Sequence, residues 1–202
     1  MPRAGAVLVA IICWVGLTVQ FSATYTHQHE VGATLWALAR FFTILTNLLL
    51  AITMTLVAIK RRVTPFMLGG VTLAILLVGV VYAVLLQGLH QLKGPALVAD
   101  NLLHKLSPAA MALWWLLFAP KQALRRNAPI RWAIYPLGYF CYALIRGRMD
   151  GRYPYPFLDV VKLGWTQTLI NAGGIAMAFI LAGLALVWLD SWRPLGSSRS
   201  SR

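Results

Sequence analysis

Acidic residues and cysteines are scarce in this chain of 202 residues. It has 5 Asp and Glu against 18 Lys and Arg, and charged residues of both signs make up only 11% of it. So few polar side chains cannot cover a water-soluble globule, which excludes a soluble enzyme with one anchor and a disordered chain. The two cysteines, Cys13 and Cys141, lie within apolar runs, which excludes a disulfide framework.

Hydrophobic residues are abundant, at 59% of the chain, and the mean hydropathy is +0.71. A spanning helix needs about 20 apolar residues, and long apolar runs alternate with clusters of charge, Pro and Gly. The sequence predicts an all-α integral membrane protein: one six-transmembrane-helix bundle over residues 1–195, then a disordered tail at 196–202. The expected spans cover residues 5–25, 34–59, 65–89, 95–119, 130–145 and 164–189.

The surplus of Lys and Arg predicts the orientation in the bilayer, because basic loops tend to stay in the cytoplasm. Eleven of the 18 basic residues, including Arg3, the turn at 60–62 and the C-terminal tail, fall on one side of the expected spans. Both termini are therefore expected in the cytoplasm. The basic segment 146–162 falls on the opposite side, and this rule does not explain its charge. No basic stretch is interleaved with aromatic residues on a soluble domain, so no nucleic-acid partner is expected.

Two expected spans carry most of the polar and ionisable residues. In the second, Arg40, Thr43 and Asn47 follow the i, i+3, i+7 spacing of one helix face. In the fourth, Asp100 lies one turn before His104. Thr43 and His104 are equally far from the outer ends of their spans. At ~1.5 Å per residue both lie about 13 Å deep, and equal depth permits contact.

A threonine hydroxyl and an imidazole at one depth predict nucleophilic catalysis. Neutral His104 is suited to remove the proton of Thr43 near neutral pH, and Asp100 would hold the ring as the third group of a triad. Backbone N–H groups inside a continuous membrane helix are already bonded, so we expect oxyanion donors to come from side chains. The best-placed donors are Arg40, Asn47 and Asn101.

Other interpretations of the same residues stay open at this point. Thr46, on an adjacent stripe, is the alternative nucleophile. The alternative role of Thr43 is structural, with its hydroxyl donating to the carbonyl four residues earlier. The alternative role of Asn47 and Asn101 is to link helices through hydrogen bonds of their side chains. A small proton-coupled transporter needs the same polar path through the membrane, so it is the alternative function.

Three motifs resemble one protein family. They are Arg-Phe-Phe-Thr at 40–43, His104 followed by Pro108, and Tyr-Pro-Tyr-Pro-Phe-Leu-Asp at 153–159. In motif order and span number, nearly the whole chain resembles the androgen-induced and androgen-dependent transmembrane hydrolases and their bacterial six-span branch. The resemblance implies an intramembrane threonine hydrolase of fatty-acid esters of hydroxy fatty acids in the bacterial plasma membrane. Thr43 would be its nucleophile and His104 its base, with no cofactor or metal ion.

The segment 153–159 is expected to form an ordered interfacial loop, because its prolines cannot continue a helix. It lies on the same side as Thr43 and His104, so it is a candidate lid. Its basic flank would attract the carboxylate or phosphate end of an amphiphile. The alternative is that Tyr and Pro only fix the loop and that Asp159 pairs with a neighbouring Arg. The expected substrate contacts here are Arg146, Arg152, Tyr153 and Asp159.

Overall fold

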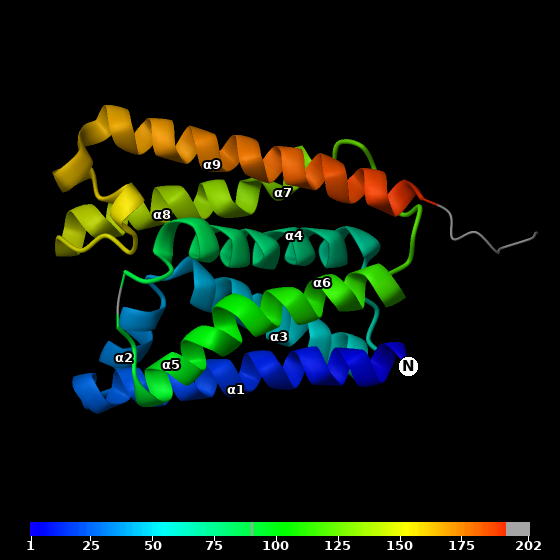
Figure 1. The fold of residues 1–202 in the computed structure, drawn as a ribbon, viewed down its shortest axis with the longest axis horizontal. Coiled ribbons are helices and arrows are strands. Elements are labelled where there is room, and N and C mark those ends of the chain that lie inside the picture. Colours follow the sequence, from blue (N-terminus) through cyan, green and yellow to red (C-terminus); the bar gives the residue numbers. More distant parts are fainter. Residues whose placement is uncertain (90, 193–202) are drawn as a thin grey trace, which may run out of the picture.

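The computed structural model describes residues 1–89 and 91–192, and no strand occurs within these two ranges. The tail expected at 196–202 lies outside the described residues. Figure 1 shows long helices side by side, with the start of α1 and the end of α9 at the same end of the bundle. The α-helices are α1 Pro2–Gln28, α2 Val31–Leu38, α3 Phe42–Ala58, α4 Pro65–Val81, α5 Gly94–Asn101, α6 Ser107–Phe118, α7 Ala128–Trp132, α8 Ile134–Asp150 and α9 Val160–Ser191. Two π-helical turns, η1 Tyr82–Leu86 and η2 Leu102–Leu106, and one 3₁₀ turn, η3 Pro156–Leu158, join them.

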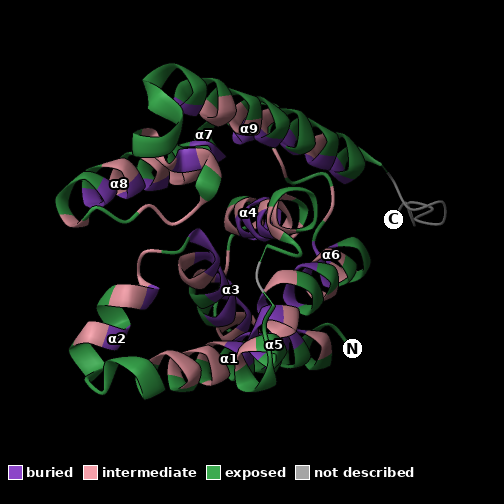
Figure 2. Cartoon of the chain, turned by 60° about the vertical axis from the view of Figure 1, so that its left-hand side comes forward, coloured by how far each residue is buried: buried purple, intermediate pink, exposed green. Residues whose placement is uncertain are grey.

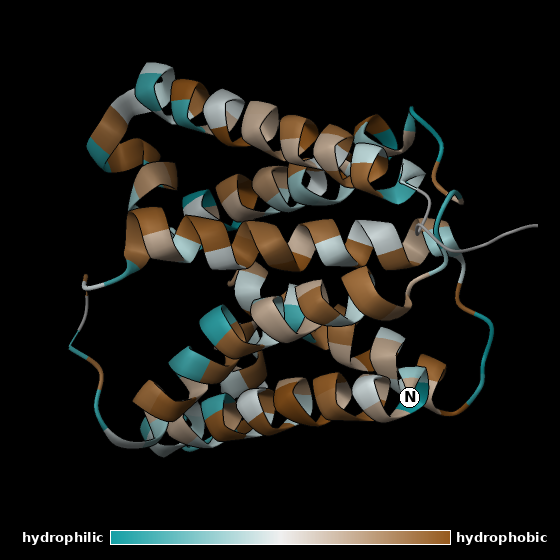
Figure 3. Ribbon diagram, turned by 45° about the vertical axis from the view of Figure 1, so that its right-hand side comes forward, coloured by the Kyte–Doolittle hydropathy of each residue, from teal (hydrophilic) through white to brown (hydrophobic). Residues whose placement is uncertain are grey.

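Several helices are suited to a bilayer. Pro2–Gln28, Pro65–Leu86 and Val160–Ser191 are each long and apolar enough to cross one, and the bent pair α2 and α3 adds a fourth candidate if it forms one span. Large apolar side chains such as Leu113 and Met177 lie exposed on the outside of the bundle. Polar residues gather in the loops at its ends (Figure 3). The described part of the chain is thus compatible with an integral membrane protein of three to four candidate spans, and six spans stay a prediction.

Helix α4 lies at the centre of the bundle (Figure 2) and packs against α3, α6, α7 and α9. The side chain of Thr64 caps its N-terminus by accepting the N–H of Met67, and Pro65 occupies the first turn, where its missing N–H costs nothing. Leu73 and Ile75 of α4 are almost completely buried in the core. Helix α3 and the turn η2, which carry candidate site residues described below, pack against this central helix.

The continuous helix expected over 34–59 is not continuous. Helices α2 and α3 meet at 98° across residues 39–41. A break leaves helix-end carbonyls without partners, and α8 supplies those partners: the Tyr139 hydroxyl donates to the Arg40 carbonyl at 2.7 Å, and the Tyr142 hydroxyl donates to the Ala39 carbonyl at 3.1 Å. Tertiary hydrogen bonds thus stabilise a bend that the apolar pattern of the segment conceals.

Helix α9 also departs from its expected bounds of 164–189. It begins at Val160, because the carboxylate of Asp159 caps it by accepting the N–H of Lys162 at 3.3 Å. It is then interrupted at Gly164, whose φ of 72° lies in the region that favours glycine. The first turn of α9 consequently joins the 153–159 loop instead of continuing the long helix.

Candidate active site

The bend before α3 places Thr43 in the first turn of a helix. Phe41 is the N-cap residue, with extended backbone, and its carbonyl accepts the N–H groups of Ile44 and Leu45. The N–H of Thr43 therefore has no carbonyl partner within the helix. It points to the Tyr155 hydroxyl, with a donor–acceptor distance of 3.5 Å. The expectation that backbone donors are all occupied here was wrong, because it assumed an unbroken helix.

Arg40 secures the bend from the other side. Its guanidinium donates to Asp150 Oδ2 at 2.8 Å and to the carbonyl of Arg152 at 3.0 Å. These contacts tie the 39–41 segment to the end of α8 and to the following loop. Arg40 lines neither of the two cavities described below. It is placed to position Thr43, and its contact with substrate or oxyanion stays a prediction.

His104 lies within the π-helical turn η2, and such turns are rare and frequent at functional sites. Pro108 follows one turn later and cannot donate to the His104 carbonyl. Helix α4 approaches this carbonyl through Gly79, where a Cβ atom would lie 3.0 Å from Pro108 and 3.5 Å from the His104 carbonyl oxygen. Glycine at position 79 therefore permits the close packing that fixes the imidazole beside α3.

Thr43 and His104 are in direct contact, which their equal expected depth permits. Thr43 Oγ1 lies 3.1 Å from His104 Nε2. On the other side of the ring, His104 Nδ1 lies 3.1 Å from Asp100 Oδ1 and 3.2 Å from the Asp100 carbonyl. The hydroxyl, imidazole and carboxylate form the chain of contacts that a nucleophile, a base and an orienting group require.

Tyr82 completes this cluster, and the sequence interpretation missed it. Its hydroxyl donates to Asp100 Oδ2 at 2.5 Å, and its ring stacks on His104. Tyr82 is the first residue of the other π-helical turn, η1. An aromatic residue near the end of an apolar span resembles an ordinary interfacial anchor, so the sequence carried no signal that distinguished it.

Thr46, the alternative nucleophile, faces another helix. Its Oγ1 lies 3.1 Å from the Tyr135 hydroxyl on α8. It is completely buried, and it lines neither cavity. Of the two threonines, Thr43 is the one in contact with the imidazole.

The structure gives Asn47 and Asn101 roles other than oxyanion donation. The Asn47 amide nitrogen donates to the carbonyls of Thr43 and Leu103, and its oxygen accepts from Ser107 at 2.6 Å. A primary amide has two donor hydrogens, so both are engaged, and Asn47 links α3 to the helix that carries His104. Asn101 donates to the Leu97 carbonyl in its own helix and lines neither cavity.

Arg146 at the end of α8 and the three loop residues expected to contact substrate line neither cavity. Arg146 is buried, stacks on Trp36 and donates to its carbonyl. Arg152 contributes backbone groups, one to Arg40 and one to Asp150. Tyr153 packs directly over Gly147, where its ring leaves no room for a Cβ. Asp159 caps α9 and pairs with Lys162 at 3.4 Å. These contacts give the four residues structural roles, as the alternative expected, but Asp159 pairs with Lys162 and not with an Arg.

Tyr155 is the residue of this loop that reaches Thr43. Its ring stacks on Phe157, with centroids 5.2 Å apart, and meets Phe41 edge-on. Burial raises the pKa of the Tyr155 phenol, so the group stays protonated at neutral pH. It accepts the Thr43 N–H and keeps its own proton to donate. The alternating Tyr-Pro pattern indicated an ordered loop, but it did not distinguish Tyr155 from Tyr153.

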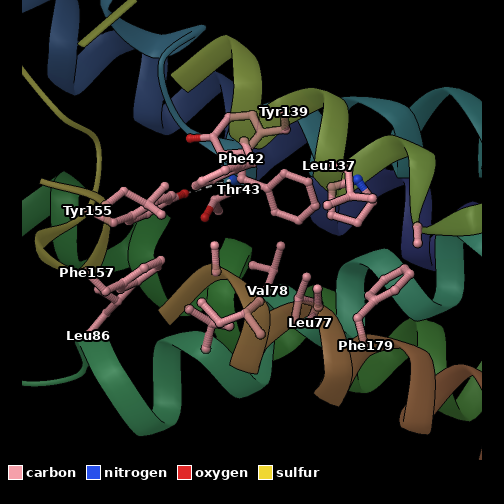
Figure 4. A pocket seen from close by; sticks show the side chains of 18 residues that line it. Phe42, Thr43, Leu77, Val78, Leu86, Leu137, Tyr139, Tyr155, Phe157 and Phe179 are labelled. Atoms are coloured by element: carbon pink, nitrogen blue, oxygen red, sulfur yellow. Dashed lines mark hydrogen bonds between the residues drawn. The ribbon is translucent and has the colours of Figure 1, made fainter. Parts of the chain in front are cut away.

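Two cavities meet at Thr43. One, of about 90 Å³, lies between α4, α8 and α9 and is lined almost entirely by apolar side chains (Figure 4). The other, of about 240 Å³, contains Asp100 and His104 and is bordered by Pro154 and Pro156 of the loop. Thr43, Leu86 and Tyr155 line both. Thr43 and His104 thus lie where an apolar cavity joins a second one, here called the polar cavity because it also contains Gln20, Tyr82, Asp100 and His104 among its apolar lining.

Comparison with known proteins identifies no relative: no family model matches the chain, and neither a curated protein nor a solved structure is significantly similar to it.

Proposed function

We propose that this chain is an integral membrane hydrolase of lipid esters, with Thr43 as nucleophile and His104 as general base. The observation that carries the proposal is the 3.1 Å contact between Thr43 Oγ1 and His104 Nε2, with a carboxylate at the opposite ring nitrogen. Its position at the junction of an apolar and a polar cavity suits an amphiphilic ester. The resemblance of the Thr, His and Tyr-Pro motifs makes fatty-acid esters of hydroxy fatty acids, or similar amphiphiles, the proposed substrates.

The proposed reaction has two balanced halves. His104 Nε2 takes the Thr43 proton as Oγ1 bonds to the ester carbonyl carbon, and the resulting imidazolium returns that proton to the alcohol as the carbon–alkoxide bond breaks. Water then bonds to the acyl carbon while His104 takes its proton. The bond to Thr43 breaks, Oγ1 regains a proton, and a fatty acid leaves. Asp100 stabilises the imidazolium in both halves.

Tyr155 and the Thr43 N–H are the proposed oxyanion donors. Stabilisation requires donors fixed about 3 Å from the site where negative charge develops. The Thr43 N–H is free of helical bonding, and the phenol beside it retains a proton at neutral pH. This pair replaces the asparagine side chains, whose donors are engaged elsewhere.

The proposed topology has six spans with both termini in the cytoplasm of a bacterial cell. Helices α5 and α6 with η2 would form the fourth span and α8 the fifth. The α6–α7 loop contains Lys121, Arg125 and Arg126. It is anchored at the end of α9 by Asp190, which accepts the N–H groups of Ala123 and Leu124. A basic loop at the end of the bundle that holds the start of α1 supports this orientation.

The test is hydrolysis by purified protein in lipid nanodiscs, with a fatty-acid ester of a hydroxy fatty acid as substrate. Thr43→Ala and His104→Ala should each lower kcat at least about 1,000-fold, because each removes a reacting group. Thr46→Val preserves shape and removes only a hydroxyl that faces Tyr135, so it should retain turnover. Full turnover by Thr43→Ala would remove the assignment.

One observation favours the alternative of a proton-coupled transporter: the bend at 39–41 interrupts a candidate span beside ionisable residues. Vesicle measurements separate the two functions. A transporter would carry protons together with a solute and would not react with a fluorophosphonate probe, whereas the hydrolase should be labelled at Thr43. Labelling that persists in Thr43→Ala would show that the probe reacts at another residue, which would contradict Thr43 as the nucleophile.

A further inference from the structure

The apolar cavity extends away from Thr43 in one direction. Figure 4 shows Thr43 and Tyr155 toward one end, Leu77 and Leu137 farther along, and Phe179 at the other end. The polar side chains that line it are Thr43, Tyr139 and Tyr155, which lie together toward the first end. Beyond them every lining residue is aliphatic, phenylalanine or proline.

We infer that this cavity binds the acyl chain of the substrate ester, and that Ala176 and Phe179 of α9 set the length of chain it accepts. The inference rests on the proposed hydrolase function and adds the placement of the two halves of the ester. The acyl carbon would lie at Thr43 with its chain directed toward Phe179. The alcohol half and the attacking water would occupy the polar cavity beside His104.

The chemistry of the lining selects the occupant. A wall without donors or acceptors beyond its mouth penalises any polar group placed there, because the group would lose its hydrogen bonds to water. An unbranched hydrocarbon chain has no hydrogen bonds to lose there, so the lining favours it over any polar group. The hydroxyl of Thr43, at the mouth, is then correctly placed to meet the one polar group of an acyl chain, its carbonyl end.

Packing on α9 closes the far end. Phe179 is 2% exposed, and its ring faces the cavity. One turn later, a Cβ at Gly183 would lie 2.7 Å from Pro129 of α7 and 3.0 Å from Leu73 of α4. Helix α9 therefore touches α7 and α4 directly beyond Phe179, which is the last residue of α9 in the cavity lining. On the cavity side of Phe179, α9 presents the small residues Ala172 and Ala176.

Enlarging Ala176 should shorten the preferred acyl chain. We would compare kcat/KM for p-nitrophenyl esters from butanoate to hexadecanoate, using wild type and Ala176→Leu in nanodiscs. The variant should lose at least about tenfold on the long esters and less than about threefold on butanoate, because only long chains reach position 176. Phe179→Ala should shift the preference in the opposite direction. Ala178→Leu is the matched control, because Ala178 is exposed on α9 and lines neither cavity.

Binding separates this inference from the proposed reaction. In the His104→Ala background, the fluorescent fatty acid cis-parinaric acid should bind, and Ala176→Leu should raise its Kd about tenfold relative to Ala178→Leu. That result without hydrolysis by the wild type would leave the chain site standing and remove the hydrolase. Hydrolysis with the same chain-length profile in Ala176→Leu, Phe179→Ala and wild type would remove the chain site and leave the hydrolase.

Discussion

The phenol ring of Tyr82 stacks on the imidazole of His104, with ring centroids 4.3 Å apart and an interplanar angle of 20°. The hydroxyl of the same tyrosine donates to Asp100, whose other carboxylate oxygen lies beside His104 Nδ1. Tyr82 therefore fixes the imidazole and its carboxylate partner together. The two rings belong to facing π-helical turns, η1 and η2, so the local departures from α-helix serve one cluster.

Asp100→Asn should lower kcat about 10²- to 10⁴-fold with little change in KM, because an amide neither stabilises the imidazolium nor enforces the reactive tautomer. Steady-state hydrolysis measures this directly. The neighbouring substitution Asn101→Ala provides the control, since Asn101 bonds only within its own helix and should leave kcat unchanged. Tyr82→Phe keeps the stacked ring and loses one hydrogen bond, so its loss should be nearer tenfold. A wild-type kcat in Asp100→Asn would contradict an orienting role.

Tyr155→Phe should lower kcat about 10²- to 10³-fold, the loss expected for one oxyanion donor. Tyr153→Phe, in the same loop, should have little effect, because its ring packs on Gly147 and lies outside both cavities.

The pH profile gives the same residue a second test. Burial raises the pKa of Tyr155 above its ordinary value of about 10. With a raised pKa, the Tyr155 phenol stays protonated at the pH values where a free tyrosine begins to lose its proton. Its hydroxyl therefore remains a hydrogen-bond donor there and is lost only at higher pH. Wild-type kcat should therefore show no fall between about pH 8 and pH 10. A decline in this range that is absent in Tyr155→Phe would contradict a protonated donor.

The approach of Thr43 to His104 could be predicted from the sequence, because depth along a span depends only on residue count and helical rise. The contact is present even though α2 and α3 meet at 98°, so that nine residues of helical rise from Thr34 do not give the true depth of Thr43. The i, i+4 relation of Asp100 to His104 was equally local. Contacts set by position within one or two helices were thus within reach of sequence reasoning.

The bend at 39–41 was not within reach, because its cause lies about a hundred residues away. The hydroxyls of Tyr139 and Tyr142 and the carboxylate of Asp150 satisfy groups that an unbroken helix would bond internally. The apolar pattern of residues 34–59 looks the same with or without these partners. Missing the bend concealed the Thr43 N–H as a candidate donor. The basic charge of 146–162 favoured Arg146 as a substrate contact, whereas its guanidinium is buried and donates to the Trp36 carbonyl of α2.

Asp150→Asn should destabilise the protein, because the carboxylate is shared by Arg40 at 2.8 Å and Arg146 at 3.5 Å. Two guanidiniums would lose their counter-charge. Removing one partner of a fully buried pair costs about 3–5 kcal/mol, and partial exposure reduces this to about 1–2 kcal/mol here. Tryptophan fluorescence during urea unfolding in micelles provides the measurement. Glu30→Gln removes the same charge at an exposed position and should leave the midpoint in place, so equal midpoints for both variants would contradict the role of Asp150.

Gly79→Leu should abolish most turnover although position 79 contacts no substrate. Even a Cβ atom there would lie 3.0 Å from Pro108, so a larger side chain must separate α4 from the helix that carries His104. A displacement of about 1 Å at the imidazole lengthens its contact with Thr43 and costs about 100-fold in kcat. Gly174→Leu tests the same substitution at an exposed position of α9 with nothing within 4 Å of its Cβ, and it should retain activity. If Gly79→Leu folds with the thermal midpoint of Gly174→Leu and hydrolyses ester at the wild-type rate, helix contact at position 79 does not set the distance between Thr43 and His104.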